Sequence, residues 1–208
     1  AYVPGEQPQD RKYIKLNTNE SPYPPPQSVA AVLNAEESAK LRLYSDPESR
    51  VLKERLARNY GRAQAEVFVS NGSDEILNFA FMAYGEQDVR FADITYGFYS
   101  VFADLYGLDA EVIPLREDFS LDAEAFCGKD GLTVITNPNA LTGMALPLAI
   151  IEEIVSSSRG VVLVDEAYVD FGAESAVNLI DQYDNLLVVQ TFSKSRSMAG
   201  ARLGFAFG

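Results

Sequence analysis

Seven short β-rich runs, separated by helical or turn segments, constrain the fold more than any other feature of this sequence. Each run is dominated by apolar and β-branched residues and is bounded by turn residues. The runs span about residues 66–70, 88–93, 110–115, 132–136, 161–165, 186–191 and 202–207. Such alternation predicts an α/β fold with a mostly parallel sheet, covered by helices on both faces. We therefore expect a seven-stranded, three-layer α/β/α domain.

Helical periodicity fills several gaps between these strands and also precedes the first one. The predicted helices span residues 28–39, 47–60, 73–84, 97–106 and 147–158. The second is expected to start at Pro47, behind the N-cap Asp46, and to end at Gly61. Residues 1–27 are rich in proline and polar groups, which break helices and ladders. We expect an extended arm over 1–27 and one domain over 28–208.

The composition excludes several classes of protein. The chain has no histidine, so it cannot hold a Ser-His-Asp triad, a Cys-His pair or a histidine-ligated metal, and we expect no metal. Its one cysteine, Cys127, excludes an internal disulfide. A net charge of −13 disfavours nucleic acid as a partner. Without a long apolar run or a basic leader, a cytoplasmic protein with no membrane partner is expected.

Two of the predicted strands end in residues suited to a ligand. In an open α/β sheet, ligands bind beyond the carboxyl ends of the strands. Residues 71–74 follow the first strand and open a helix, where free N–H groups suit a phosphate, although they also fit a plain helix cap. Asp165 and Glu166 follow the fifth strand, with Tyr168 close behind. A carboxylate there can hold a cation or a protonated ring nitrogen, or it can be another cap.

A third strand end carries a lysine. Lys194 follows the sixth strand, within a cluster that contains Thr191, Ser193, Ser195 and Arg202. A lysine in this position is most often a solvated charge, but burial and nearby cations lower its pKa and make it a nucleophile for a Schiff base. The hydroxyls and the arginine supply donors for an anion. Together, the three strand ends match what pyridoxal phosphate requires: a phosphate site, an acid for the ring nitrogen and an imine-forming amine.

The chain resembles the fold type I pyridoxal-phosphate-dependent aminotransferases, and among them the histidinol-phosphate aminotransferases. The segments that carry the resemblance run in family order through all 208 residues: "YVPGEQ", "KLNTNESPYPPP", "RLYSDPE", "SNGSDEIL", "DITYGFYS", "TNPNALTG", "VVLVDEAYVDF" and "TFSKSRSMAGARLGF". Each segment alone is a weak signal, whereas eight in order at family-like spacing are specific.

The resemblance implies a role for each matching residue. Lys194 would form the Schiff base and move a proton, Asp165 would pair with the pyridine nitrogen, and Tyr168 would bond the phenolic oxygen. The ring would pack on Tyr96, and the phosphate would take the remaining donors. The implied cofactor-binding residues are Gly72, Ser73, Asp74, Tyr96, Asn139, Asp165, Tyr168, Thr191, Ser193, Lys194, Arg202 and Tyr44.

Partners and substrates follow from the same resemblance. It implies a homodimer in which Tyr44 reaches the phosphate of the neighbouring subunit, and an arm that places Asn17 and Glu20 over the substrate. The implied reaction is amino transfer between histidinol phosphate and 2-oxoglutarate, in histidine biosynthesis. Aromatic amino acids are the next choice of substrate, and a decarboxylase or lyase of the threonine-phosphate type is an alternative. A truncated, non-catalytic module is another.

Two departures from the family pattern bear on these expectations. Where the family commonly reads Asn-Pro-Asn-Asn-Pro-Thr-Gly, residues 137–143 place Ala140 and Leu141 at the inner positions. Either Asn139 takes over the missing contact, or Tyr168 makes it alone. The family's small C-terminal domain has no counterpart before Gly208. Since that domain grips the substrate carboxylate, we expect this chain to transaminate poorly. The first turn also lacks the G-x-G-x-x-G pattern of nicotinamide dehydrogenases.

Overall fold

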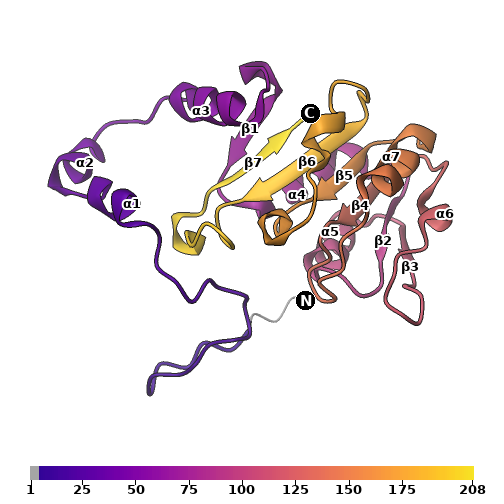
Figure 1. Ribbon diagram of the computed structural model, residues 1–208, viewed down its shortest axis with the longest axis horizontal. Helices are drawn as coiled ribbons and strands as arrows, with labels where there is room; N and C mark the ends of the chain where they lie inside the picture. The colour runs from indigo at the N-terminus through magenta and orange to yellow at the C-terminus, as the bar shows by residue number, and fades with distance from the viewer. Residues whose placement is uncertain (1–4) are drawn as a thin grey trace.

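A computed structural model describes residues 5–208, and a seven-stranded sheet forms its centre (Figure 1). The strand order is β1-β7-β6-β5-β4-β2-β3. The strands are β1 (Val67–Ser70), β2 (Val89–Ala92), β3 (Ala110–Ile113), β4 (Leu132–Thr136), β5 (Val162–Asp165), β6 (Leu186–Thr191) and β7 (Gly204–Phe207). Strand β7 runs antiparallel to β1 and β6, and the remaining pairs are parallel. The predicted mostly parallel sheet is confirmed.

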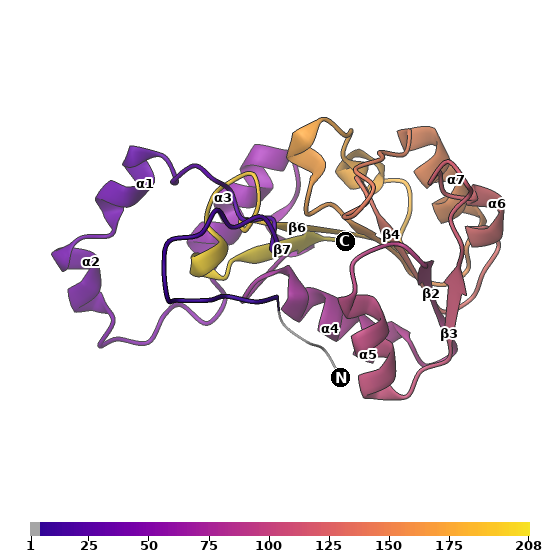
Figure 2. The same ribbon diagram turned by 90° about the horizontal axis from the view of Figure 1, so that it is seen from below.

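Helices cover both faces of this sheet. The α-helices are α1 (Gln27–Val32), α2 (Ala35–Lys40), α3 (Arg50–Tyr60), α4 (Ser73–Tyr84), α5 (Phe98–Tyr106), α6 (Ala123–Phe126) and α7 (Leu148–Ser157). Short 3-10 helices are η1 (Gln64–Glu66), η2 (Val169–Phe171), η3 (Ala176–Leu179) and η4 (Ala199–Ala201). Figure 2 shows α4 and α5 below the sheet and α3, α6 and α7 above it. This is the expected three-layer arrangement.

The core forms two clusters, one on each side of the sheet. Successive side chains of a strand point to opposite faces, so neighbours in sequence join different clusters. On β5, Leu163 packs with α4 and α5, whereas Val162 and Val164 pack with α3 and α7. All three are fully buried. Continuous apolar runs such as "VVLV" therefore mark strands that are covered on both faces.

Two predicted helices differ from the structure. The single helix expected over 28–39 is wrong, because the chain breaks after Val32 and begins a second helix at Ala35. The intervening Asn34 has an extended backbone, and its side chain accepts a hydrogen bond from the N–H of Glu37 at 3.0 Å. An asparagine caps a helix more favourably than it sits inside one, which explains the break.

The helix expected over 47–60 begins three residues later, at Arg50. Asp46 does bind backbone N–H groups, at 3.2 Å from Glu48 and 3.1 Å from Arg50. However, Ser49 adopts a left-handed backbone with φ of 50°, so regular helix can start only after it. The end of the helix at Gly61, with φ of 65°, agrees with the prediction.

The segment before α3 has few contacts with the sheet. Within the described residues, neither α1 nor α2 contains a buried side chain. Both helices project away from the sheet in Figures 1 and 2. Residues 5–26 contain no helix or strand. The boundary between an arm and a domain at residue 27 stays a prediction.

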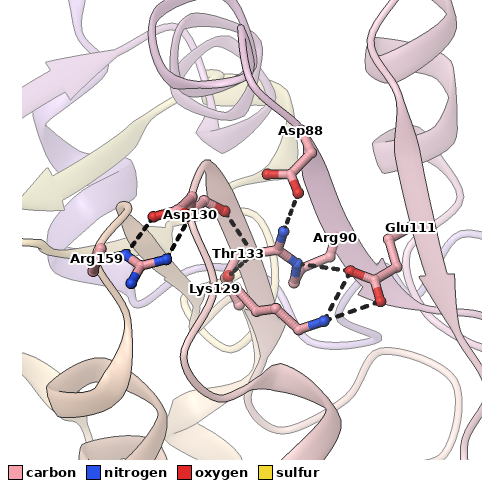
Figure 3. Close-up of polar contacts among 7 residues, drawn as sticks. All are labelled: Asp88, Arg90, Glu111, Lys129, Asp130, Thr133 and Arg159. Atoms are coloured by element: carbon pink, nitrogen blue, oxygen red, sulfur yellow. Dashed lines mark hydrogen bonds and ion pairs between the residues drawn. The ribbon is translucent and has the colours of Figure 1, made fainter.

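A buried arginine joins three strands at the amino-end edge of the sheet (Figure 3). Arg90 on β2 is 1% exposed. Its guanidinium donates to the carbonyl of Asp130 at 2.7 Å, to Thr133 Oγ1 at 3.2 Å and to Glu111 Oε2 at 3.1 Å, and it pairs with Asp88. Five donors in a fixed fork suit this set of acceptors. The arginine therefore ties β2, β3 and the start of β4 together.

We predict that Arg90→Met lowers the free energy of unfolding by about 3 kcal/mol, because the carbonyl of Asp130, the buried hydroxyl of Thr133 and the carboxylate of Asp88 lose the donor that they share. The matched control is Arg159→Met. Arg159 pairs with Asp130 but has 74% of its side chain exposed, so its loss should cost less than about 1 kcal/mol. Urea unfolding of both variants measures the difference, and equal losses would contradict the role given to Arg90.

A second buried ionisable group holds β5, β6 and η3 together. Glu166 is 1% exposed and directly follows β5. Its carboxylate accepts hydrogen bonds from Ser175 Oγ at 2.7 Å, from the N–H of Ala176 at 2.6 Å and from Gln190 Nε2 at 2.8 Å. Burial raises the pKa of Glu166 from its usual 4.5 to about 7, although these three hydrogen bonds oppose the shift.

Stability should therefore depend on pH through Glu166. The folded chain holds this proton more tightly than the unfolded chain, so the contribution is fully present below pH 4.5 and is lost as pH rises through about 7. Glu166→Gln removes the titration. Relative to wild type, the variant should gain up to roughly 3 kcal/mol between these limits. Urea unfolding at several pH values, with exposed Glu153→Gln as control, measures this gain, and a pH-independent difference would contradict it.

Candidate active site

A cavity of about 190 Å³ lies at the carboxyl ends of β4, β5 and β6, beside the start of α4. Parallel strands bring their carboxyl ends to one edge of a sheet, which is why residues far apart in sequence meet here. The cavity is lined by Thr18, Glu20, Ser73, Asp74, Tyr96, Thr136, Ala140, Asp165, Ala167, Tyr168, Thr191, Ser193, Lys194, Ala199 and Arg202. The three strand ends singled out in the sequence are therefore brought together.

Two glycines let an arginine lie against the start of α4. Gly72 has φ of 87°, and a side chain there would collide with the guanidinium of Arg202. A side chain on Gly204 would collide with the backbone of Gly72 and Ser73. The turn between β1 and α4 can therefore pack closely on β7. Arg202 Nη2 lies 3.6 Å from Asp74 Oδ2, so a cation stands beside the N-terminus of a twelve-residue helix.

Hydroxyls from the end of β6 and from the loop after it line the same cavity as the start of α4. Thr191 Oγ1 lies 3.0 Å from Ser193 Oγ and also accepts the N–H of Ser193 at 3.2 Å. Both residues line the cavity with Ser73 and Arg202. A helix N-terminus, hydroxyl donors and a guanidinium together form a site for a phosphate-sized anion.

Asp165 supplies a buried carboxylate to the floor of the cavity. It is 3% exposed and accepts hydrogen bonds from Tyr99 Oη at 2.7 Å and from the N–H of Ala167 at 3.0 Å. Tyr99 also pairs with Thr136 Oγ1 at 2.9 Å. Burial raises the pKa of Asp165, and the hydrogen bonds from Tyr99 and Ala167 oppose the rise. A protonated ring nitrogen in the cavity would favour the ionised carboxylate.

Lys194 also lines the cavity, and its amine contacts the N-terminal segment. Its Nζ donates to the carbonyl of Thr18 at 3.2 Å and lies 5.5 Å from the centre of the Tyr168 ring. Tyr168 Oη accepts a hydrogen bond from Asn19 at 3.0 Å. The N-terminal segment, which is distant in sequence from Tyr168 and Lys194, therefore contacts one side of the cavity.

Tyr96 forms another wall. Its hydroxyl donates to Asp74 Oδ1 at 2.9 Å, and its ring stacks on Phe98 with centroids 5.5 Å apart. These contacts fix the ring at the edge of the cavity. An aromatic wall, a buried acid, an amine and an anion site suit a flat heterocyclic aldehyde that carries a phosphate.

Four of the predicted site residues, Gly72 among them, do not line the cavity. The side chain of Tyr44 is fully exposed. Asn17 donates instead to the carbonyl of Glu6 at 2.8 Å. Asn139 donates to the carbonyl of Ile94 at 2.8 Å, and Ala140 lines the cavity in its place. Glu20 does line the cavity, where it pairs with Lys15 at 2.7 Å.

Sequence reasoning missed several residues of this site. Tyr99 lies in the first turn of α5, whereas Tyr96 precedes the helix, so helical spacing gave no signal that Tyr99 reaches Asp165. Thr18 and Asn19 contact the site through a segment without regular structure, and no sequence pattern predicts its path. Thr136, Ala167 and Ala199 line the cavity because strand ends and loops meet there.

The described residues were also compared with the requirements of a metal site and of a membrane-spanning helix. No group of three or more acidic or cysteine side chains in residues 5–208 could hold a metal ion. Over the same residues, no helix has the length and apolar character needed to cross a bilayer.

Comparison with known proteins identifies the family. A family model for aminotransferase class I and II matches residues 11–208. The chain is 55% identical over 210 residues to a histidinol-phosphate aminotransferase of Clostridium acetobutylicum, and 57% identical over 211 residues to one of Marinomonas sp. strain MWYL1. Both alignments cover 100% of this chain, and the chain spans 60% of the length of each relative.

A solved structure gives the same fold. The histidinol-phosphate aminotransferase of Sinorhizobium meliloti, crystallised with pyridoxal-5'-phosphate, matches with a TM-score of 0.79 at 24% identity, over 92% of this chain and 55% of that one. With a sheet, a cavity and a family match that agree, the chain belongs to the aminotransferase class I and II family.

Proposed function

We propose that the whole protein is a pyridoxal-phosphate-dependent aminotransferase that acts on histidinol phosphate with 2-oxoglutarate as amino acceptor. One observation carries the proposal: Lys194, the buried Asp165 and the anion site at α4 line a single cavity. The relatives at 55% and 57% identity bear the name of that activity. Because the chain spans 60% of their length, turnover is assigned to the whole protein and cofactor binding to this chain.

Different residues of the chain would bind different parts of pyridoxal phosphate. The N-terminus of α4, the hydroxyls of Thr191 and Ser193, and Arg202 would hold the phosphate. The carboxylate of Asp165 would accept a hydrogen bond from the protonated ring nitrogen, and Tyr168 would donate to the phenolic oxygen. When bound, pyridoxal phosphate supplies an electron sink for chemistry at the α-carbon of the substrate. Lys194 would hold the cofactor and move the proton at that carbon.

The N-terminal segment would have to release Lys194 when the cofactor binds, because the carbonyl of Thr18 accepts a hydrogen bond from the amine. Asn17 and Glu20 would then face the substrate. A homodimer is part of the proposal. The fully exposed Tyr44 lies between α2 and α3, on the part of the chain that projects from the sheet. It would reach the phosphate of a neighbouring subunit.

Incubation with pyridoxal phosphate should produce a visible absorbance band that Lys194→Ala abolishes, because the band requires a Schiff base to that amine. Borohydride reduction and peptide mass mapping should place the adduct on Lys194. Lys129→Ala is the control, since Lys129 lies on the surface beside Glu111 and outside the cavity. An unchanged band in Lys194→Ala would contradict the assignment.

The same spectrum tests the substrate. Histidinol phosphate should shift the band of the loaded chain, whereas O-phosphothreonine should not. The opposite response would favour a decarboxylase.

Asp165→Asn should weaken binding of pyridoxal phosphate by about 10- to 100-fold, which corresponds to the loss of one charge-assisted hydrogen bond. The asparagine oxygen can accept from the N–H of Ala167 while its amide donates to Tyr99 Oη, whose proton can turn to Thr136 Oγ1, so the fold should persist. Absorbance titration measures the dissociation constant. Asp118→Asn, at an exposed loop position, controls for the loss of a carboxylate, and equal affinities in both variants would argue against the pairing of Asp165 with the ring.

A further inference from the structure

A network of buried polar side chains lies next to the cavity without lining it. Gln190, on β6, is 1% exposed, and both ends of its amide are used. Its Nε2 donates to Glu166 at 2.8 Å, while its Oε1 accepts from Tyr60 Oη at 2.6 Å and from Arg196 Nη2 at 3.0 Å. A polar group in the interior of a sheet is costly unless it is hydrogen-bonded, and here both the nitrogen and the oxygen of the amide have partners.

Arg196 connects this network to three other segments. Its Nη2 donates to Tyr60 Oη at 2.9 Å, and its Nη1 donates to the carbonyl of Thr191 at 3.3 Å. Its Nε lies 3.3 Å from Asp170 Oδ2. The side chain is 24% exposed, so these contacts are only partly screened by water. The fork of the guanidinium is used on several sides at once, which a point charge could not reproduce.

Aromatic rings complete the surroundings of Arg196. The guanidinium carbon lies 5.0 Å from the centre of the Phe192 ring and 5.2 Å from that of Phe205. Both distances fit a cation–π contact. The guanidinium is therefore held by rings as well as by acceptors.

Arg196 lies close to Lys194 in the sequence, so the network can affect the position of the lysine. Arg196 follows Lys194 by two residues, in the loop between β6 and β7. The N–H of Ser197 bonds the carbonyl of Lys194 at 3.0 Å, so a tight turn encloses Arg196. Ser195 also bonds Asp170. Both residues after Lys194 are thus fixed to η2, and Arg196 is fixed to β6 and to the end of α3 as well.

At its other end, Glu166, the network adjoins Asp165, which lines the cavity. Glu166 directly follows Asp165, and Gln190 directly precedes Thr191. Fixing Gln190 between Glu166 and Arg196 therefore sets the segment of Asp165 against the loop of Lys194. Neither Glu166 nor Arg196 lines the cavity, so any effect on a ligand passes through the neighbours.

We infer that Arg196 is a positioning residue for Lys194, and that the chain Glu166–Gln190–Arg196 sets the amine relative to the Asp165 carboxylate. The inference rests on the proposed function, in which Lys194 and Asp165 hold opposite ends of one cofactor. A displacement of about 1 Å between such groups is enough to change binding and reactivity markedly.

The test compares Arg196→Leu and Arg196→Lys with wild type, with Arg159→Leu as a matched control at an exposed position. Pyridoxal phosphate is titrated into each protein to obtain the dissociation constant. The pH at which the absorbance of the bound chromophore changes is then measured, because it reports the surroundings of the Lys194 nitrogen. Thermal unfolding without cofactor reports the stability of each fold.

We expect Arg196→Leu to weaken binding at least about tenfold and to move the pH midpoint by about half a unit or more, with the control unchanged. Arg196→Lys keeps a charge without the fork, so it should fold and show a smaller change in the same direction. If Arg196→Leu fails to fold, Arg196→Lys decides.

Several results would overturn the inference. Binding and pH midpoint that stay at wild-type values in the Arg196 variants would do so. Weaker binding with an unchanged pH midpoint would also do so, because it would reduce Arg196 to a stabilising role. If wild type itself does not bind pyridoxal phosphate, the proposed function fails, and the inference falls with it. That outcome is separate, since it is seen before any variant is made.

Discussion

The parallel register of β4, β5 and β6 is the constraint on which the rest of the site depends. Thr136 of β4 pairs with Asp165 of β5, and β6 ends at Thr191 on the same edge. All residues of these strands except the partly buried Leu187 are buried, so their register is fixed by core packing on both faces. A change of one residue in register would turn the Asp165 side chain away from the cavity.

Buried polar groups divide the sheet into two regions with different roles. At the amino ends of the strands, Arg90 binds carboxylates and a carbonyl and ties neighbouring strands together. At the carboxyl ends, Asp165 is satisfied by two donors but still faces an open cavity. Glu166, one residue on, is satisfied by three donors and serves the scaffold. The two adjacent carboxylates thus lie in different surroundings, because successive side chains at the end of β5 point to opposite faces of the sheet.

Much of this arrangement could be predicted. The strands were recognisable from apolar runs, and the anion site from residues 71–74 at the start of a helix. The errors came where local signals compete. The predicted helix over 28–39 ignored the capping preference of Asn34, and the start at Pro47 ignored the left-handed backbone of Ser49. Helix ends are decided by single side chains and backbone angles, to which periodicity is insensitive.

The sequence by itself determined the family, the sheet and the residue types that could bind a phosphate-bearing aldehyde, because these follow from periodicity and from motifs close in sequence. Tertiary structure decided which of those residues meet. It placed Ala140 in the cavity and turned Asn139 toward Ile94. It also brought Thr18 to Lys194, and Arg196 to Gln190 and Tyr60. These contacts depend on the paths of loops and on hydrogen-bond partners far away in the chain, which no local pattern encodes.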